Sequence, residues 1–248
     1  MTAAEISEAN ERLRARSPLE IVRWAIARAN GRAIVSTNFR PYEAVVLHLA
    51  VQVQPDIPVL WVDHGYNRPA TYRHAEDLRL RLRLNLRAYL PRLTAAQRDA
   101  LHGPVPGPED EAGLQRFSAV MKLEPFRRGM AELAPTVWIT ALRKVQNPAR
   151  AGLAVVAPDA NFGAVKVNPI FHLTDAELEA YLARHGLPNE WDYHDPAKAD
   201  EKRECGLHAA WGGGAAAAAA GVNVAGPAVP GATGKTSRPI PEPALSSP

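Results

Sequence analysis

The sequence predicts an α/β fold in which helices sandwich a mostly parallel sheet. Two short β-branched runs, at 33–36 and 59–62, are each followed by a polar turn and then by a helical pattern. This alternation favours parallel strands, because a helix usually makes the crossover between two of them. With 248 residues, 46% of them hydrophobic, the chain has enough material for one core of ordinary size and a tail.

Local signals place the elements of the first half. A capping box at 17–20, with Pro18 at the first helical position, starts a firm helix that Gly31 ends. The β-branched runs are typical of buried strands, and the helical stretches repeat their apolar residues at helical spacing. In chain order we expect helix-like residues at 4–16, a helix at 18–30, a strand at 33–36, a helix at 42–54, a strand at 59–62, a loop at 63–69, a helix at 70–82 and a strand at 84–90.

The second half continues the pattern as far as His208. A proline-rich acidic loop lies between Gly103 and Gly113, and helices flank Pro125. Strands are expected at 136–142 and 164–167, followed by a helix that a capping box at 174–177 starts and Gly186 ends.

Three regions follow from this pattern. Residues 1–30 are expected to form helices packed on the core, and 31–208 the α/β domain. Residues 209–248 form a tail rich in Ala, Gly and Pro, which cannot bury enough apolar surface to offset its ordering entropy. We therefore expect the tail to be disordered.

Composition narrows the class of protein. A formal charge of +3 is too small to indicate nucleic acid or an anionic membrane as a partner. The N-terminus is acidic and lacks an apolar run, and the chain has no long apolar stretch, so a cytoplasmic protein is expected. A single cysteine excludes an internal disulfide, a CxxC pair and a four-cysteine cluster. The eight histidines show no metal-ligand spacing, so no metal is expected.

Three turns follow expected strands, at the edge where open α/β sheets bind ligands. Residues 36–41 after the first strand, with three small polar side chains and a basic one, suit a phosphate or sulfate cradle, or an ordinary N-cap cluster. Residues 63–67 offer an acid, a glycine and an aromatic that could cover a base or ribose, or they form a plain turn. The basic residues of 143–150 could neutralise sulfate and phosphate groups, or simply be solvated.

A fourth cluster, KRECGLH at 202–208, surrounds the only cysteine. Lys202 and Arg203 favour the thiolate of Cys205, whereas Glu204 opposes it. The alternative is a small buried hydrophobe, although so polar a stretch is harder to bury. A reactive Cys205 is therefore one interpretation of the residues alone.

The KRECGLH string resembles the C-terminal motif of the thioredoxin-dependent phosphoadenylyl sulfate reductases and adenylyl sulfate reductases. The similarity extends through 55–89, 122–130, 138–153 and 165–187, and covers roughly 31–208. It implies a Rossmann-like sheet of the adenine nucleotide alpha hydrolase type. It also implies reduction of phosphoadenylyl sulfate to sulfite and adenosine bisphosphate in assimilatory sulfate reduction, with a possible homodimer as the assembly.

The resemblance assigns roles to individual residues. It makes Cys205 the nucleophile, forming a Cys S-sulfonate, with Glu204 and His208 as its catalytic neighbours. Thioredoxin or glutaredoxin is the implied external reductant, and the lone cysteine implies the type without an iron–sulfur cluster. The implied substrate-binding residues are Ser36, Thr37, Asn38, Phe39, Asp63, Gly65, Tyr66, Arg143, Lys144, Gln146, Arg150, Lys202 and Arg203.

Two features depart from the family pattern. Arg40 and Pro41 stand where the family has a glycine after the aromatic residue of its first turn, and a short segment replaces the longer one between Gly186 and the cysteine motif. Three alternatives therefore stay open. They are adenylyl sulfate as the substrate, an ATP pyrophosphatase-like adenylating enzyme, whose usual SGGxDS pattern is absent here, and a sulfonucleotide-binding protein without catalysis.

Overall fold

The computed structural model describes residues 1–146 and 152–196. Its helices are α1 (Ala3–Leu13), α2 (Pro18–Ala29), α3 (Glu43–Val53), α4 (Pro69–Leu82), α5 (Ala95–His102), α6 (Glu111–Ser118), the π-helix η1 (Ala119–Leu123), α7 (Glu124–Leu133), the short 3-10 helix η2 (Lys144–Gln146) and α8 (Asp175–His185). Its strands are β1 (Ala33–Thr37), β2 (Pro58–Val62), β3 (Asn85–Tyr89), β4 (Val137–Ile139), β5 (Val156–Pro158) and β6 (Val165–Val167). No helix among these residues is long and apolar enough to cross a membrane.

The described strands form one sheet in the order β3-β2-β1-β4-β6-β5. All neighbours are parallel except β5, which runs antiparallel to β6. Val35 of β1 pairs with Val59 on one side and with Ile139 on the other. Strands β2 and β3 therefore lie on one side of β1, and β4, β6 and β5 lie on the other. The carboxyl ends of β1 and β4 form the topological switch point, the place where open α/β sheets bind ligands.

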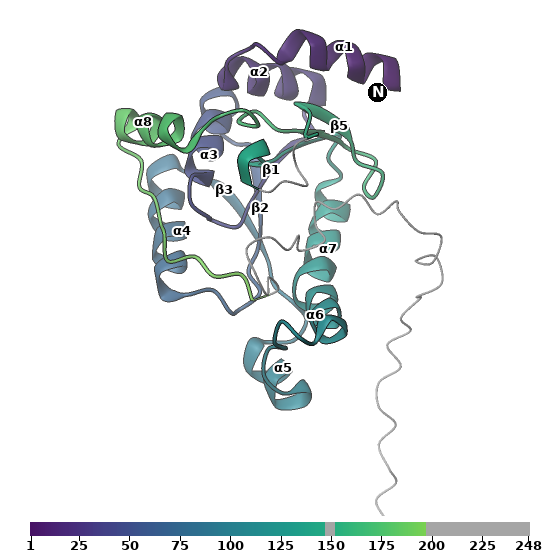
Figure 1. Cartoon of the computed structure of the whole chain (residues 1–248), viewed down its shortest axis with the longest axis vertical. Coiled ribbons are helices and arrows are strands. Elements are labelled where there is room, and N and C mark those ends of the chain that lie inside the picture. The colour runs from purple at the N-terminus through teal and green to yellow at the C-terminus, as the bar shows by residue number, and fades with distance from the viewer. Residues whose placement is uncertain (147–151, 197–248) are drawn as a thin grey trace, which may run out of the picture. The chain divides into compact units, whose positions relative to one another are not determined.

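Helices cover both faces of the sheet. Alternate residues of a strand point to opposite faces, so Ala33 and Val35 join one buried cluster, with α2, α3 and α8, while Ile34 joins the other. Phe126 and Met130 of α7 pack in the second cluster. Figure 1 shows α7 on one side of the sheet and α3 and α4 on the other. The predicted α/β sandwich is confirmed.

Helix ends follow the predicted chemistry. The capping boxes of Ser17 with Glu20 and of Thr174 with Glu177 both form. Gly186 ends α8 with a φ of 61°, a left-handed conformation that costs glycine little. Strand β4 is shorter than the expected 136–142, because the Thr140 hydroxyl accepts the backbone N–H of Leu142 at 3.3 Å and so forms a local turn.

Three described elements were not predicted from the sequence: α5, β5 and the short 3-10 helix η2. Strand β5 forms the outer edge of the sheet, and α1 packs against it. The side-chain amide of Asn10 donates to the Val156 carbonyl at 2.8 Å and accepts the Val156 N–H at 2.9 Å. These bonds join residues 146 positions apart, so local pattern could not predict them.

Candidate active site

The first turn follows β1 and is organised by Glu43, the first residue of α3. Its carboxylate accepts the Thr37 hydroxyl at 2.8 Å and the backbone N–H groups of Asn38 at 2.7 Å and Arg40 at 3.3 Å. A carboxylate thus occupies backbone donors of the kind that bind sulfate or phosphate oxygens. In this chain Glu43 therefore occupies these donors of the turn.

The side chains of this turn differ in what they contact. Ser36 and Asn38 are half-buried. The Ser36 hydroxyl accepts the indole N–H of Trp138, from β4, at 2.7 Å. Phe39, by contrast, is fully buried with a φ of 55°, and its ring meets Trp61 edge-on at 5.1 Å. Phe39 therefore packs in the core and supports the turn.

The second turn follows β2 and is held by Asp63. Its carboxylate accepts the Gly65 N–H at 3.0 Å, the Asn67 amide at 3.0 Å and the Tyr72 hydroxyl at 2.7 Å. Gly65 has a φ of 78°, a conformation that favours glycine. These bonds fix the backbone of the turn.

The aromatic residue of this turn points toward α5 and α6. The Tyr66 hydroxyl donates to Asp99 at 2.6 Å, and the Tyr66 ring lies 5.3 Å from that of Phe117. Burial, together with the hydrogen bond to Asp99, raises the pKa of Tyr66 to about 12. Tyr66 therefore stays protonated at neutral pH.

A buried titratable cluster adjoins the second turn. His64 accepts the Tyr66 N–H on Nδ1 at 3.1 Å, and burial, with the nearby charge of Lys122, lowers the pKa of His64 to about 4. Lys122 in η1 donates to the Asp195 carboxylate at 2.6 Å, with both side chains buried. Lys122 begins the 122–130 stretch of the family resemblance, but the sequence did not connect it with Asp195, which lies 73 positions away.

The third turn follows β4. Arg143 donates to Asp175 at 2.6 Å and to the Leu173 carbonyl at 3.3 Å, and its guanidinium lies 5.1 Å from the centre of the Tyr42 ring. Arg143 thereby joins the starts of α3 and α8. Lys144 is exposed, with its ammonium 5.1 Å from the centre of the Phe171 ring.

The remaining predicted residues are placed only in part. Gln146 closes η2. Arg150, Lys202, Arg203, Glu204, Cys205 and His208 lie outside the described residues. Their assigned roles stay predictions.

Residues 187–196, which we call the strap, cross the first two turns. The Tyr42 N–H donates to Asn189 at 2.8 Å, the Arg40 guanidinium lies 5.6 Å from the centre of the Tyr193 ring, and Arg68 forms an ion pair with Asp192. Figure 1 shows the strap in light green, running from the end of α8 past α4 toward the sheet. Through these contacts the strap joins the starts of α3 and α4 at the carboxyl edge of the sheet.

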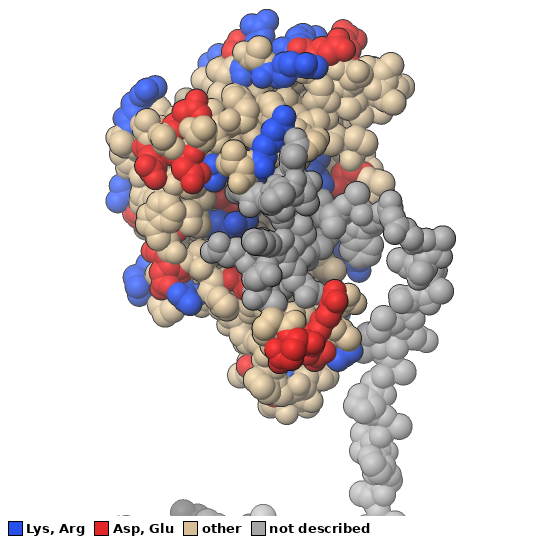
Figure 2. Space-filling model, in the orientation of Figure 1, with Lys and Arg blue, Asp and Glu red and all other residues tan. Residues whose placement is uncertain are grey.

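The remaining surface of the described residues mixes charges of both signs. Basic and acidic side chains intersperse on the face seen in Figure 2, in keeping with the small net charge. Within 1–146 and 152–196, no group of three or more His, Cys, Asp or Glu residues could hold a metal ion.

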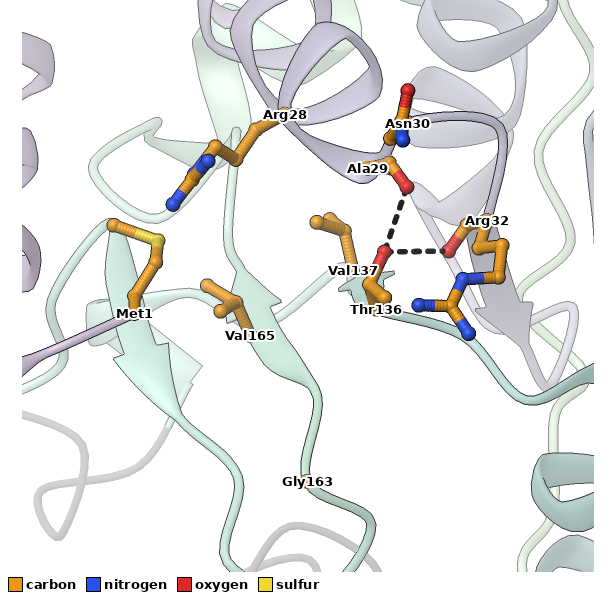
Figure 3. A pocket seen from close by; sticks show the side chains of 9 residues that line it. All are labelled: Met1, Arg28, Ala29, Asn30, Arg32, Thr136, Val137, Gly163 and Val165. Carbon is orange, nitrogen blue, oxygen red and sulfur yellow. Dashed lines mark hydrogen bonds between the residues drawn. The ribbon is translucent and has the colours of Figure 1, made fainter.

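A pocket of about 260 Å³ lies at the opposite, amino-terminal ends of β1, β4 and β6 (Figure 3). It is lined by Met1, Arg28, Ala29, Asn30, Arg32, Thr136, Val137, Gly163 and Val165. The Thr136 hydroxyl there donates to the Ala29 carbonyl at 2.8 Å. This pocket contains none of the predicted site residues.

Comparison with known proteins identifies the family. The model of the phosphoadenosine phosphosulfate reductase domain matches residues 32–191. A phosphoadenosine 5'-phosphosulfate reductase of Synechococcus sp. is 33% identical over 226 residues, which cover 82% of this chain and 97% of the relative. One from Alkalilimnicola ehrlichii is 35% identical over 230 residues, covering 84% of this chain and 93% of that protein.

A solved structure has the same fold. The phosphoadenylyl-sulfate reductase of Candida auris, crystallised as a phosphate complex, superposes with a TM-score of 0.68 at 22% identity, over 77% of this chain and 90% of that one. The resemblance drawn from the sequence motifs is therefore confirmed. This chain belongs to the phosphoadenosine phosphosulfate reductase family of oxidoreductases.

Proposed function

We propose that this protein reduces phosphoadenylyl sulfate to sulfite and adenosine bisphosphate in sulfate assimilation, with Cys205 as the nucleophile. The observation that carries the proposal is the set of polar and basic side chains at the switch point of the sheet, where Ser36 and Asn38 lie at the end of β1 and Arg143 and Lys144 follow β4. The relatives named phosphoadenosine 5'-phosphosulfate reductases, which align over most of the chain, support the same substrate.

In the first step the Cys205 thiolate attacks the sulfur of the nucleotide. A bond forms between the two sulfur atoms, the bond from sulfur to the bridging phosphate oxygen breaks, and adenosine bisphosphate leaves with that electron pair. The product on the enzyme is a Cys S-sulfonate. Lys202 and Arg203 precede the cysteine in the sequence, and we assign to them the stabilisation of charge on the leaving phosphate.

The second step uses a dithiol protein, thioredoxin or glutaredoxin. One of its thiolates attacks the sulfur of Cys205, which releases sulfite and leaves a mixed disulfide. The second thiol of the partner then resolves that disulfide, so the partner supplies both electrons. The single cysteine of this chain fits such an external reductant, and it cannot supply the ligands of a four-cysteine cluster.

The contacts of the first turn refine how it would hold the substrate. Because Glu43 already accepts the N–H groups of Asn38 and Arg40, we assign substrate contacts to side chains. Ser36 accepts a hydrogen bond from Trp138 and can donate its own hydroxyl hydrogen, and Asn38 is half-buried beside it. Phe39 supports these groups from the core, and Arg143 and Lys144 place basic charge at the neighbouring strand end.

The test is mass spectrometry of the full chain mixed with phosphoadenylyl sulfate in the absence of thioredoxin. The wild type should gain one sulfonate on Cys205, and Cys205→Ser should gain none and produce no sulfite when thioredoxin is added. Binding of adenosine bisphosphate should change by no more than about threefold, because the thiol acts mainly in the chemical step.

Parallel reactions separate the alternatives. Adenylyl sulfate as the only sulfonate donor would reassign the substrate. Release of pyrophosphate from ATP without sulfite would indicate an adenylating enzyme, and nucleotide binding without an adduct on the wild type would indicate a binding protein. Sulfite production by Cys205→Ser would overturn the assigned nucleophile.

A further inference from the structure

The strap ends at a buried ion pair whose energetics suggest a role in positioning. Lys122 Nζ lies 2.6 Å from Asp195 Oδ2, and the two side chains are only 1% and 4% exposed. Removing both charges from water is costly, and well-packed apolar residues in place of such a pair often leave a protein equally stable. Stability alone therefore explains this pair poorly, whereas a fixed location for the strap explains it well.

The surroundings of the pair place it at the active-site edge. The charges of Lys122 and Asp195 both shift the pKa of His64, which directly follows β2. The charges of Asp63 and His194 shift this pKa as well. Burial keeps His64 neutral at physiological pH, so it does not compete with Lys122 as a second cation beside Asp195. The pair thus joins the strap to the base of the second turn.

The rest of the strap is held along its length. Asn189 accepts the Tyr42 N–H at 2.8 Å, and Trp191 meets the Tyr42 ring edge-on at 5.2 Å. Arg68 pairs with Asp192. These contacts fix the beginning of the strap over the first turn, and the Lys122–Asp195 pair fixes its end.

The location of Asp195 limits where the proposed nucleophile can reach. Cys205 follows Asp195 by ten residues, and an extended chain spans at most about 3.3–3.6 Å per residue. Because Asp195 is held at the carboxyl edge, the length of the backbone from Asp195 onward sets the largest distance at which Cys205 can lie from that edge.

We propose that Asp195, held by Lys122, is a positioning residue that brings Cys205 to the bound sulfonucleotide. The inference rests on the proposed function of Cys205. In this proposal the ion pair does not contact the substrate. Its effect belongs to the step in which the thiolate attacks sulfur, because displacing a reacting group by about 1 Å can cost about a hundredfold in rate.

The first experiment measures S-sulfonate formation in a single turnover on the full chain, with phosphoadenylyl sulfate and no reductant. Asp195→Asn should lower this rate by about 10- to 100-fold, while the Kd for adenosine bisphosphate stays within about threefold. Because Asp195→Asn removes the carboxylate charge that Lys122 contacts, the double variant Lys122→Met/Asp195→Leu is measured as well, and it should show the same loss.

The matched control is Asp159→Asn. Asp159 lies 2.9 Å from Lys166 in another buried ion pair, between the loop after β5 and β6. If a buried pair matters here only for folding, both Asp→Asn variants should lose rate equally. Positioning predicts that Asp159→Asn keeps the wild-type rate within about twofold.

A second measurement does not depend on catalysis. Nitroxide labels on Cys205 and on Leu101→Cys, an exposed position of α5, report the distribution of distances between the two sites with adenosine bisphosphate bound. Asp195→Asn should broaden this distribution relative to the wild type, and Asp159→Asn should not.

The outcomes separate the two proposals. A wild type that forms no S-sulfonate refutes the proposed function, and the label distances then decide whether Asp195 positions Cys205. A wild type that reacts, with an Asp195→Asn variant that reacts equally fast or loses no more than Asp159→Asn, refutes the positioning role. An unchanged label distribution in Asp195→Asn refutes it too.

Discussion

Glu43 accepts the backbone N–H of Asn38 at 2.7 Å, so the residue that begins α3 also closes the turn that precedes it. The same carboxylate binds the Thr37 hydroxyl and the Arg40 N–H. One side chain thus determines the shape of the first turn.

Replacing Glu43 should therefore destabilise the protein. Glu43→Ala removes the acceptor of three donors and should lower the free energy of unfolding by about 2 kcal/mol, because donors left without a partner in a partly buried turn are costly. Glu43→Gln keeps one oxygen acceptor and should lose less. Urea denaturation measures both, with Glu11→Ala on the exposed face of α1 as a control expected within about 0.5 kcal/mol. Equal stability of Glu43→Ala and the wild type would contradict this account.

His64 should make stability depend on pH. Its pKa is about 4 in the folded protein and 6.5 in its ordinary state. Between these values the unfolded chain binds a proton that the folded one does not, so the free energy of unfolding falls as pH drops from 6.5 toward 4, by up to about 1.4 kcal/mol per unit. In His64→Asn, which can still accept the Tyr66 N–H, this slope should be smaller. Denaturation at several pH values measures it, and a slope identical to that of the wild type would exclude His64 as the source.

Gly129 allows α7 to approach the sheet closely. A Cβ at this position would lie 2.8 Å from Tyr89 Cε2 and 2.9 Å from Leu60 Cδ1. Gly129→Ala should therefore lower the free energy of unfolding by about 1–2 kcal/mol, since the overlap outweighs the better helix propensity of alanine. Gly152→Ala is the control, because nothing lies within 4 Å of its Cβ. A stabilised Gly129→Ala protein would show that α7 can move away at little cost.

Residues 212–248 belong to the tail and lie outside the described residues. A protein ending at Trp211 should keep both the unfolding midpoint and the rate of sulfite formation of the full chain, because the tail composition indicates no contribution to the core. Thermal unfolding and a thioredoxin-coupled assay would measure the two quantities. Loss of activity with an unchanged midpoint would assign the tail a role in turnover.

Features that depend on neighbouring residues were predictable from the sequence. The capping boxes at Ser17 and Thr174, the alternation of strands with helices, and the polar turns after β1, β2 and β4 all depend on residues a few positions apart. The family motifs added the identity of the reductase. Together they predicted the fold class and the edge of the sheet where the site lies.

Features that depend on distant partners were not predictable. Strand β5 has only three residues, and its partners are β6 and the Asn10 side chain. The Lys122–Asp195 pair joins two segments that no periodicity connects. Phe39, which the resemblance assigns to substrate binding, is fully buried against core residues such as Trp61. In each case tertiary packing decided the outcome.

The two hydrogen bonds between the Asn10 side chain and the Val156 backbone have a consequence for solubility. An open edge strand offers its backbone groups to other chains and so promotes aggregation, and here one amide side chain takes both outward groups of Val156, as an additional strand would. Variants in which α1 is removed or displaced from β5, such as proteins expressed with a shortened N-terminus, should therefore self-associate while they still turn over substrate.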